Sequence, residues 1–150
     1  MRMIKQGLRY SEVAIGQIFV ERMEITDAHL TLGASLIGDF NPLHVDENFA
    51  QRSRYGGRIL HGVITSAIIG APVGMIFAGT AIGYLEHNCK FLGPVKASDT
   101  LTTTWTVEAK EDKPKHDGGV VRMRAECVNQ AGATVAQASG AMLVKNGLVA

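Results

Sequence analysis

The segment from His61 to Ala78 constrains the fold more than any other part of the chain, because most of its side chains are apolar or small on every face. A helix that is apolar all round is buried all round. Glycines and Pro72 interrupt the segment, and a membrane span needs about 20 apolar residues in a row. We therefore predict a central core helix, bent between Gly70 and Pro72, where the proline removes a backbone hydrogen bond.

The chain after this helix has the pattern of β-strands. Residues 80–92 form one candidate strand, and three later segments alternate their side chains between two faces. The three segments are residues 101–109, 121–127 and 136–144. Because short turn sequences separate them, they predict an antiparallel meander. We expect an α+β protein, a curved antiparallel sheet wrapped around a long central helix, in a single domain over residues 1–150.

The first part of the chain predicts shorter elements. Residues 17–23 are rich in β-branched and aromatic side chains and predict a strand or extended arm. Residues 27–37 predict an amphipathic helix that Gly38 terminates. Asp46 can then cap a short helix over residues 47–52.

Composition excludes several classes of partner. The net charge is only +1 and there is no run of basic residues, so we expect no nucleic-acid partner. Cys89 and Cys127 lie far apart with no metal-binding spacing, which indicates buried thiols in a reducing compartment and no metal site; the alternative is a disulfide between them. The N-terminal residues lack the apolar core of a signal peptide. We therefore expect a cytoplasmic protein with no membrane partner.

The run GDFNPLHVD, residues 38–46, gathers two acids, an amide and an imidazole around a proline. Pro42 restricts its own backbone and that of Asn41, so the run predicts a rigid, non-helical elbow. Such an elbow can hold Asp39 and His44 in fixed relative positions for shared acid–base chemistry. The alternative is that the acids are turn and cap residues and the histidine is incidental. Taken alone, the run favours this alternative, because Asx-Pro turns are common.

Three motifs together resemble a known family. The run GDFNPLHVD, the later YGGRILHG at residues 55–62, and FLGPV at residues 91–95 with Asp99 beyond it resemble the MaoC-like (R)-specific enoyl-CoA hydratases of the hot-dog fold. The match covers about residues 17–145 in order and spacing. Its specific part is the Asp-to-His pair around Asn-Pro, followed by His-Gly at the start of the helix.

This resemblance implies the addition of water to a trans-2-enoyl-CoA, or the reverse dehydration, in fatty acid metabolism. The product would be the (R)-3-hydroxyacyl-CoA, and coenzyme A would enter only as part of the substrate, with no further cofactor. Asp39 and His44 match the catalytic positions, and their individual proton roles stay open. The helix start offers free N–H groups, so the Gly62 amide is a candidate oxyanion donor. The alternative is that Gly62 serves only helix packing.

Four further residues are candidates for substrate binding: Asn41, Arg58, Thr65 and Ser66. Each has a plainer alternative. Asn41 can stabilise the elbow, a loop arginine such as Arg58 is often only solvated, and helical serines and threonines usually bond back to the preceding turn. We expect His61 to be a structural histidine with its hydrogen bonds satisfied.

The sequence also bears on two alternative functions and on the oligomeric state. A hot-dog thioesterase would carry a carboxylate on the central helix, and residues 62–79 contain none. A non-catalytic acyl-CoA-binding or assembly subunit would be expected to lack Asp39 or His44. A single short sheet leaves its edges open, so we expect a homodimer or a dimer of dimers. The sequence does not predict acyl-chain length, the choice between coenzyme A and acyl carrier protein, or reaction direction.

Overall fold

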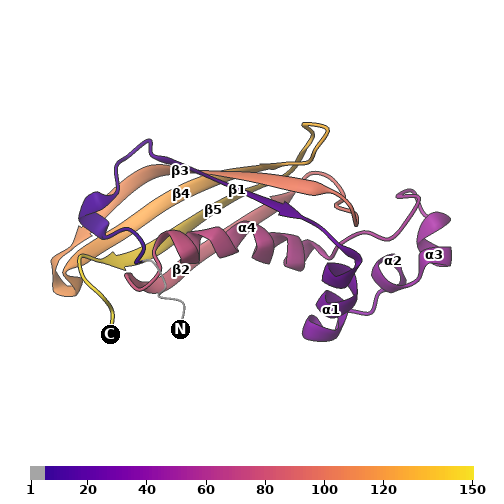
Figure 1. Cartoon of the computed structure of the whole chain (residues 1–150), viewed down its shortest axis with the longest axis horizontal. Coiled ribbons are helices and arrows are strands. Elements are labelled where there is room, and N and C mark those ends of the chain that lie inside the picture. The colour runs from indigo at the N-terminus through magenta and orange to yellow at the C-terminus, as the bar shows by residue number, and fades with distance from the viewer. Residues whose placement is uncertain (1–5) are drawn as a thin grey trace.

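The computed structural model describes residues 6–150 and consists of one antiparallel sheet with a long helix against it (Figure 1). The five strands lie in the order β1-β3-β4-β5-β2. The strands are β1 (Ile18–Glu24), β2 (Ala81–Phe91), β3 (Thr100–Lys113), β4 (Gly118–Val128) and β5 (Thr134–Lys145). The helices are α1 (Asp27–Ile37), α2 (Pro42–Val45), α3 (Glu47–Gln51) and α4 (Gly62–Ile76), with two 3₁₀ turns at Tyr10–Glu12 and Pro114–His116.

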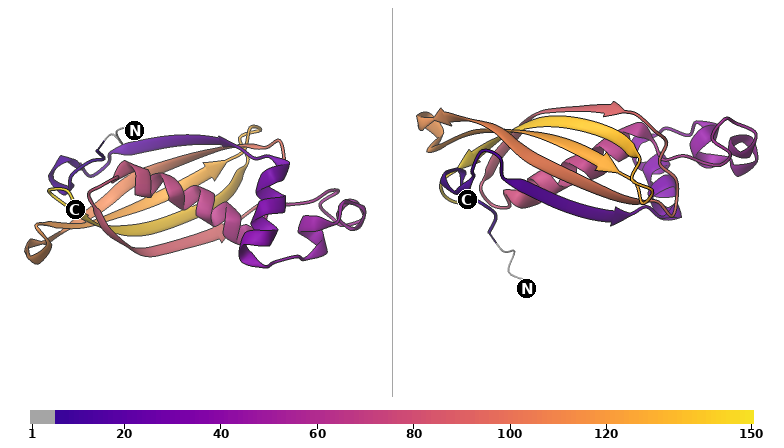
Figure 2. Two further views of the ribbon diagram at one scale, coloured as in Figure 1. Left: turned by 60° about the horizontal axis from the view of Figure 1, so that its bottom comes forward. Right: turned by 90° about the horizontal axis from the view of Figure 1, so that it is seen from above.

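The predicted meander is present in β3, β4 and β5, which are consecutive both in the chain and in the sheet. Strand β2 departs from it, because it pairs with β5 and not with its chain neighbour β3. Strands β1 and β2 are therefore the two edges. Figure 2 shows α4 lying along one face of the sheet, with α1, α2 and α3 gathered beyond one of its ends. The predicted α+β class, a curved antiparallel sheet around a central helix, is confirmed.

Helix α4 is buried on one face only, so the prediction of burial on every face was wrong for the single chain. Ile69 and Val73 are 0% and 2% exposed, whereas Val63 and Met75 are 60% and 68% exposed. The physical reason is that the sheet covers one side of the helix, and no other element of residues 6–150 covers the opposite side (Figure 2). The helix continues through Pro72 to Ile76.

Small residues on α4 let it approach β2 closely. A Cβ added at Gly62 would lie 3.3 Å from the Phe91 ring, and one at Gly70 would lie 3.2 Å from His87. Ser66 lies between these glycines, and its Oγ is 2.8 Å from Nε2 of His87. Residues four apart share one face of a helix. This face therefore fixes the position of the α4 start against the sheet.

The structure contains no helix within residues 6–150 that has the length and apolarity needed to cross a membrane.

Candidate active site

The chain enters the site through a sharp turn at the end of α1. Gly38 adopts a left-handed conformation with φ of 75°, and its N–H donates to the Ala34 carbonyl at 2.9 Å. An Asp39 carboxylate oxygen then accepts the Asn41 N–H at 3.1 Å, and the Asn41 side chain accepts the Leu43 N–H at 3.0 Å. These side-chain hydrogen bonds hold residues 39–41 in an extended elbow.

The predicted non-helical elbow is wrong for its second half, because Pro42–Val45 form the helical turn α2. The reason is local. Proline suits the first position of a helix, where its missing N–H removes no helical hydrogen bond, and Asn41 caps the turn. The turn carries His44 and directs its ring back toward Asp39.

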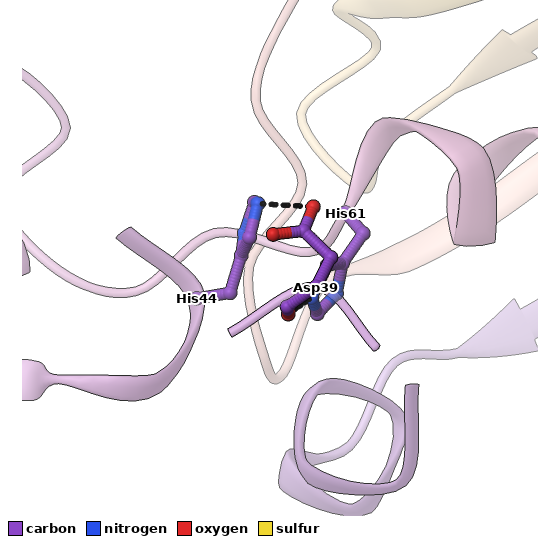
Figure 3. A group of neighbouring side chains, drawn as sticks. All are labelled: Asp39, His44 and His61. Atoms are coloured by element: carbon purple, nitrogen blue, oxygen red, sulfur yellow. Dashed lines mark hydrogen bonds and ion pairs between the residues drawn. The ribbon is translucent and has the colours of Figure 1, made fainter. Parts of the chain in front are cut away.

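Asp39 and His44 face each other across this elbow (Figure 3), with 3.8 Å between the Asp39 Oδ2 and His44 Nε2 atoms. The other His44 nitrogen, Nδ1, lies 2.8 Å from the Ile59 carbonyl oxygen. A carbonyl can only accept, so Nδ1 carries the proton and Nε2 presents a lone pair toward Asp39 in the neutral ring. The His44 side chain is 12% exposed and that of Asp39 is 47% exposed. The pair thus combines a shielded base with a carboxylate open to solvent.

His61 is a third member of this group, although its sequence position predicted only a structural role. Its Nε2 lies 2.8 Å from the Asp39 main-chain oxygen, and its ring stacks on that of His44 with the centroids 3.8 Å apart. The prediction of a fully satisfied histidine was wrong, because its buried Nδ1 has no hydrogen-bond partner. The signal that pointed here was the His-Gly pair at the helix start. The three side chains each offer a potential metal ligand, and these atoms lie within 4.8 Å of one another.

A pocket of about 310 Å³ adjoins His44 and the start of α4. Gly62 and Thr65 line it from the helix, and Tyr55 and Phe91 line it from neighbouring segments. The first helical hydrogen bond runs from the Thr65 N–H to the His61 carbonyl at 2.9 Å. The N–H groups of residues 62–64 precede that bond and have no acceptor within the helix. The pocket therefore combines His44 with free backbone donors, and Asp39 lies next to it, 3.8 Å from His44.

Comparison with known proteins assigns this arrangement to a family. Residues 12–131, most of the chain, match the family model described as MaoC like domain. The chain belongs to the MaoC-like domain family. The matched segment contains Asp39, His44, His61 and Gly62.

Named relatives agree with this assignment. The MaoC-like chain is 34% identical over 98 residues to an (R)-specific enoyl-CoA hydratase of Rhodospirillum rubrum, covering 65% of this chain and 68% of the relative. It is 31% identical over 94 residues to a 3-hydroxybutyryl-CoA dehydratase of Methylorubrum extorquens, covering 63% of this chain and 60% of the relative. The R-hydratase PhaJ1 of Pseudomonas aeruginosa, in its unliganded form, superposes with a TM-score of 0.82 at 32% identity, over 93% of this chain and 87% of that one. The predictions of the family, the hot-dog fold and the hydratase or dehydratase class are confirmed.

The four predicted substrate-binding residues have different surroundings in this MaoC-like domain. Asn41 caps α2, and the Thr65 hydroxyl donates to the His61 carbonyl at 3.1 Å while its residue lines the 310 Å³ pocket. Arg58 forms ion pairs with Asp27 and, at 3.2 Å, with Glu47. The hydrogen bond to Asp27 raises the pKa of the Arg58 guanidinium. Roles for these residues in substrate binding stay predictions.

Ser66 belongs to a separate polar group beneath α4. It contacts Nε2 of His87, whose Nδ1 lies 2.8 Å from the Tyr84 hydroxyl. Burial lowers the pKa of His87, and the hydrogen bond with Ser66 opposes that shift. Burial also raises the pKa of Tyr84 to about 12. This group is neutral near pH 7, and it fixes the packing of α4 on β2.

A larger hollow of about 760 Å³ lies on the other side of α4, against β1 and β3. Ile68, Met75 and Trp105 line it, and Asp39, His44 and Gly62 do not. Size and chemistry therefore point to different hollows. We place the reacting atoms at the smaller one, because only there do titratable side chains and free backbone donors converge.

Proposed function

We propose that this protein adds water to a trans-2-enoyl-CoA to give the (R)-3-hydroxyacyl-CoA, or catalyses the reverse dehydration. The observation that carries this proposal is the 3.8 Å approach of the Asp39 carboxylate to Nε2 of His44, beside a pocket formed by the start of α4. The names of the Rhodospirillum rubrum and Methylorubrum extorquens relatives support the substrate class.

The spacing of Asp39 and His44 suits the activation of a water molecule. Polar atoms farther apart than about 3.5 Å are commonly bridged by water. A water between them would donate one hydrogen to the Asp39 carboxylate and the other to His44 Nε2. As its oxygen bonds to the β-carbon, His44 takes the proton, and Asp39 stabilises the resulting imidazolium. His44 then delivers that proton to the α-carbon on the same face. One O–H bond of water and the π bond between the α- and β-carbons break, and one C–O and one C–H bond form.

The electron pair displaced during this attack moves to the thioester oxygen. A developing oxyanion is stabilised by donors that are already oriented toward it. We assign this part to the Gly62 N–H at the positive end of the α4 dipole. The Phe91 ring lies close to Gly62, so a side chain at residue 62 would compete with the ring for space. Gly62 thus lets the Phe91 ring lie against the start of α4.

In this proposal the four predicted substrate-binding residues support the reaction without transferring protons. Asn41 fixes the elbow that carries the acid–base pair, and Thr65 lines the pocket near the thioester. Ser66 acts through His87 on the position of the helix, and Arg58 would meet the carrier phosphates only by exchanging its present carboxylate partners. We propose that the reaction needs no cofactor beyond the coenzyme A of the substrate.

We further propose that the active form is at least a homodimer. The outer edges of β1 and β2 have no strand partner within residues 6–150. Apolar side chains are also exposed around α1 and the start of α4, where Leu32, Leu36 and Val63 are 67%, 81% and 60% exposed. Exposed apolar surface next to an open sheet edge is typical of an interface. A second copy would cover this apolar surface and the edge of β2, whose Phe91 lies against the start of α4.

The proposed activity is tested with crotonyl-CoA. Loss of the enoyl absorbance without release of free thiol supports hydration, and chiral analysis should identify the (R) product. Release of thiol would instead indicate a thioesterase. No reaction with enoyl thioesters of any length would support a non-catalytic subunit, and an (S) product would contradict the proposed stereochemistry.

A further inference from the structure

We propose that His61 is a positioning residue that sets the separation of Asp39 and His44; this inference rests on the proposed function. His61 immediately precedes α4 and is 1% exposed. Its side chain makes no capping hydrogen bond to the helix, although it occupies the cap position. The ring therefore serves something other than the helix that follows it.

The first contact of His61 is with the backbone of Asp39. The Asp39 carbonyl at 2.8 Å only accepts hydrogen bonds, so His61 Nε2 must carry a proton. The same residue is held from its side chain, where Oδ1 accepts the Asn41 N–H. Asp39 is thus fixed at two points, one on its main chain and one on its carboxylate.

The second contact is with the face of the His44 ring. The rings of His61 and His44 are 3.8 Å apart at their centroids and are tilted by 30° (Figure 3). The Ile59 carbonyl holds His44 in the plane of its ring, at Nδ1. A stacked neighbour restricts the remaining freedom, rotation of the ring out of that plane. His61 therefore touches both members of the pair at once.

The third observation, an unpaired buried nitrogen, shows that packing alone does not explain a histidine at this position. The Nδ1 atom of His61 is buried without a partner, and a Cβ added at Gly33 of α1 would lie 3.6 Å from it. A buried acceptor without a donor is unfavourable, and an apolar ring of the same size would avoid this cost. The gain that offsets it is the hydrogen bond to Asp39, which an apolar ring cannot make.

Two substitutions separate these contacts. His61→Phe keeps a stacking ring and loses the donor, whereas His61→Gln keeps an N–H donor and loses the ring. His116→Phe is the matched control, since His116 lies in an exposed turn between β3 and β4. With crotonyl-CoA we expect His61→Phe to lower kcat by about 10- to 100-fold, because small misplacements of catalytic groups are costly. KM should stay within about threefold, because the pocket lining is retained. His61→Gln should recover part of the rate.

A second readout does not depend on activity. Nitrogen NMR of labelled histidines reports the tautomer of His44, which should be the Nδ1–H form in the unsubstituted protein. We expect a mixed tautomer in His61→Gln, which loses the ring that restrains His44, and no change in His61→Phe or His116→Phe. If His61→Phe fails to fold, the His44 signals of His61→Gln decide: a mixed tautomer supports the proposal, and an unchanged one overturns it.

Two results would overturn this role for His61. One is a His61→Phe protein with the kcat of the control. The other is a rate loss that only follows a loss of folded protein, with His44 unchanged in His61→Gln. An unsubstituted protein that hydrates no enoyl-CoA would instead refute the proposed function, and the NMR comparison would still judge the position of His61.

Discussion

The main-chain carbonyl of Ile59 accepts the Nδ1 proton of His44 at 2.8 Å, and this contact decides which nitrogen of His44 can act as a base. Ile59 is itself fixed, because its N–H donates to the Leu43 carbonyl at 3.1 Å and the following Leu60 N–H donates to the Val95 carbonyl at 2.7 Å. The tautomer of neutral His44 thus depends on backbone contacts between α2, the segment before α4 and the loop after β2.

The acid–base pair gives the first prediction. Asp39→Asn and His44→Gln should each lower the hydration rate by about 10²- to 10⁴-fold, because each removes a group that transfers or stabilises the proton. The double variant should lose far less than the product of the two effects, since residues that act as a unit are not additive. Initial rates with crotonyl-CoA measure all three.

Asp46→Asn is the matched control for this experiment. The Asp46 side chain accepts the Phe49 N–H at 3.0 Å to cap α3, and asparagine can keep that bond. Its rate should equal that of the unsubstituted protein. A folded Asp39→Asn or His44→Gln protein with the rate of this control would move the chemistry to other residues.

Two glycines of α4 give the second prediction. Gly62→Ala places a Cβ 3.3 Å from Phe91 at the proposed oxyanion donor, so we expect kcat to fall by up to about 100-fold. Gly74→Ala is the control, because a Cβ there meets nothing within 4 Å. Alanine in a helix interior is favoured over glycine by about 1 kcal/mol, so this change should stabilise the protein without altering kcat. Equal rates for the two variants would remove Gly62 from the mechanism.

His87 gives a prediction about pH. Burial lowers its pKa in the folded protein below the ordinary value of about 6.5. The unfolded chain therefore binds more protons than the folded one as the pH falls below that value, and the folded state loses stability. Unfolding midpoints between pH 8 and pH 5 should decrease less in His87→Gln than in the unsubstituted protein. A His116→Gln control should keep the full decrease, and identical slopes for all three would contradict the assignment to His87.

The parts of the fold in which strands that are neighbours in the chain pair with each other could be predicted from the sequence. Alternation along residues 101–109 and 121–127 predicts paired strands, and a short turn joins them, so the pairing of Trp105 with Ala125 needs no distant information. The pairing of β2 with β5 is different, since it joins residues such as His87 and Gly140 across two intervening strands of the chain. Periodicity shows which face of a strand is apolar but does not name its neighbour.

The site was predictable to the same extent. Asp39 and His44 lie on one short run, so their proximity follows from the elbow. His61 is 22 residues from Asp39, and no spacing rule connects a residue before a helix with the end of an earlier one. The exposed outer side of α4 also escaped prediction, because composition shows that a helix is apolar without showing whether this chain or another covers it.

The predicted absence of a required metal can be tested directly. Asp39, His44 and His61 offer ligand atoms within 4.8 Å of one another, but His61 Nε2 already donates to the Asp39 carbonyl. Zinc needs ligands at about 2.0–2.2 Å, so binding through His61 Nε2 would break that hydrogen bond. We expect dialysis against a chelator to leave the rate unchanged and added Zn²⁺ to inhibit. Activity that is lost on chelation and restored by a metal would contradict this view.

The last prediction concerns assembly. Leu36 on α1 is 81% exposed and Ile15 before β1 is 66% exposed, yet only Leu36 adjoins the apolar surface around α1 and α4 that we assign to the second copy. A buried charge without a partner is costly, so Leu36→Glu should dissociate the dimer, whereas Ile15→Glu should not. Sedimentation should find the unsubstituted protein at twice 16.1 kDa or more, and Leu36→Glu shifted toward the mass of one chain. If the second copy helps to build the acyl-CoA site, hydration should fall with the dimer across a dilution series. A fully active protein that sediments as a single 16.1 kDa chain would refute the proposed assembly.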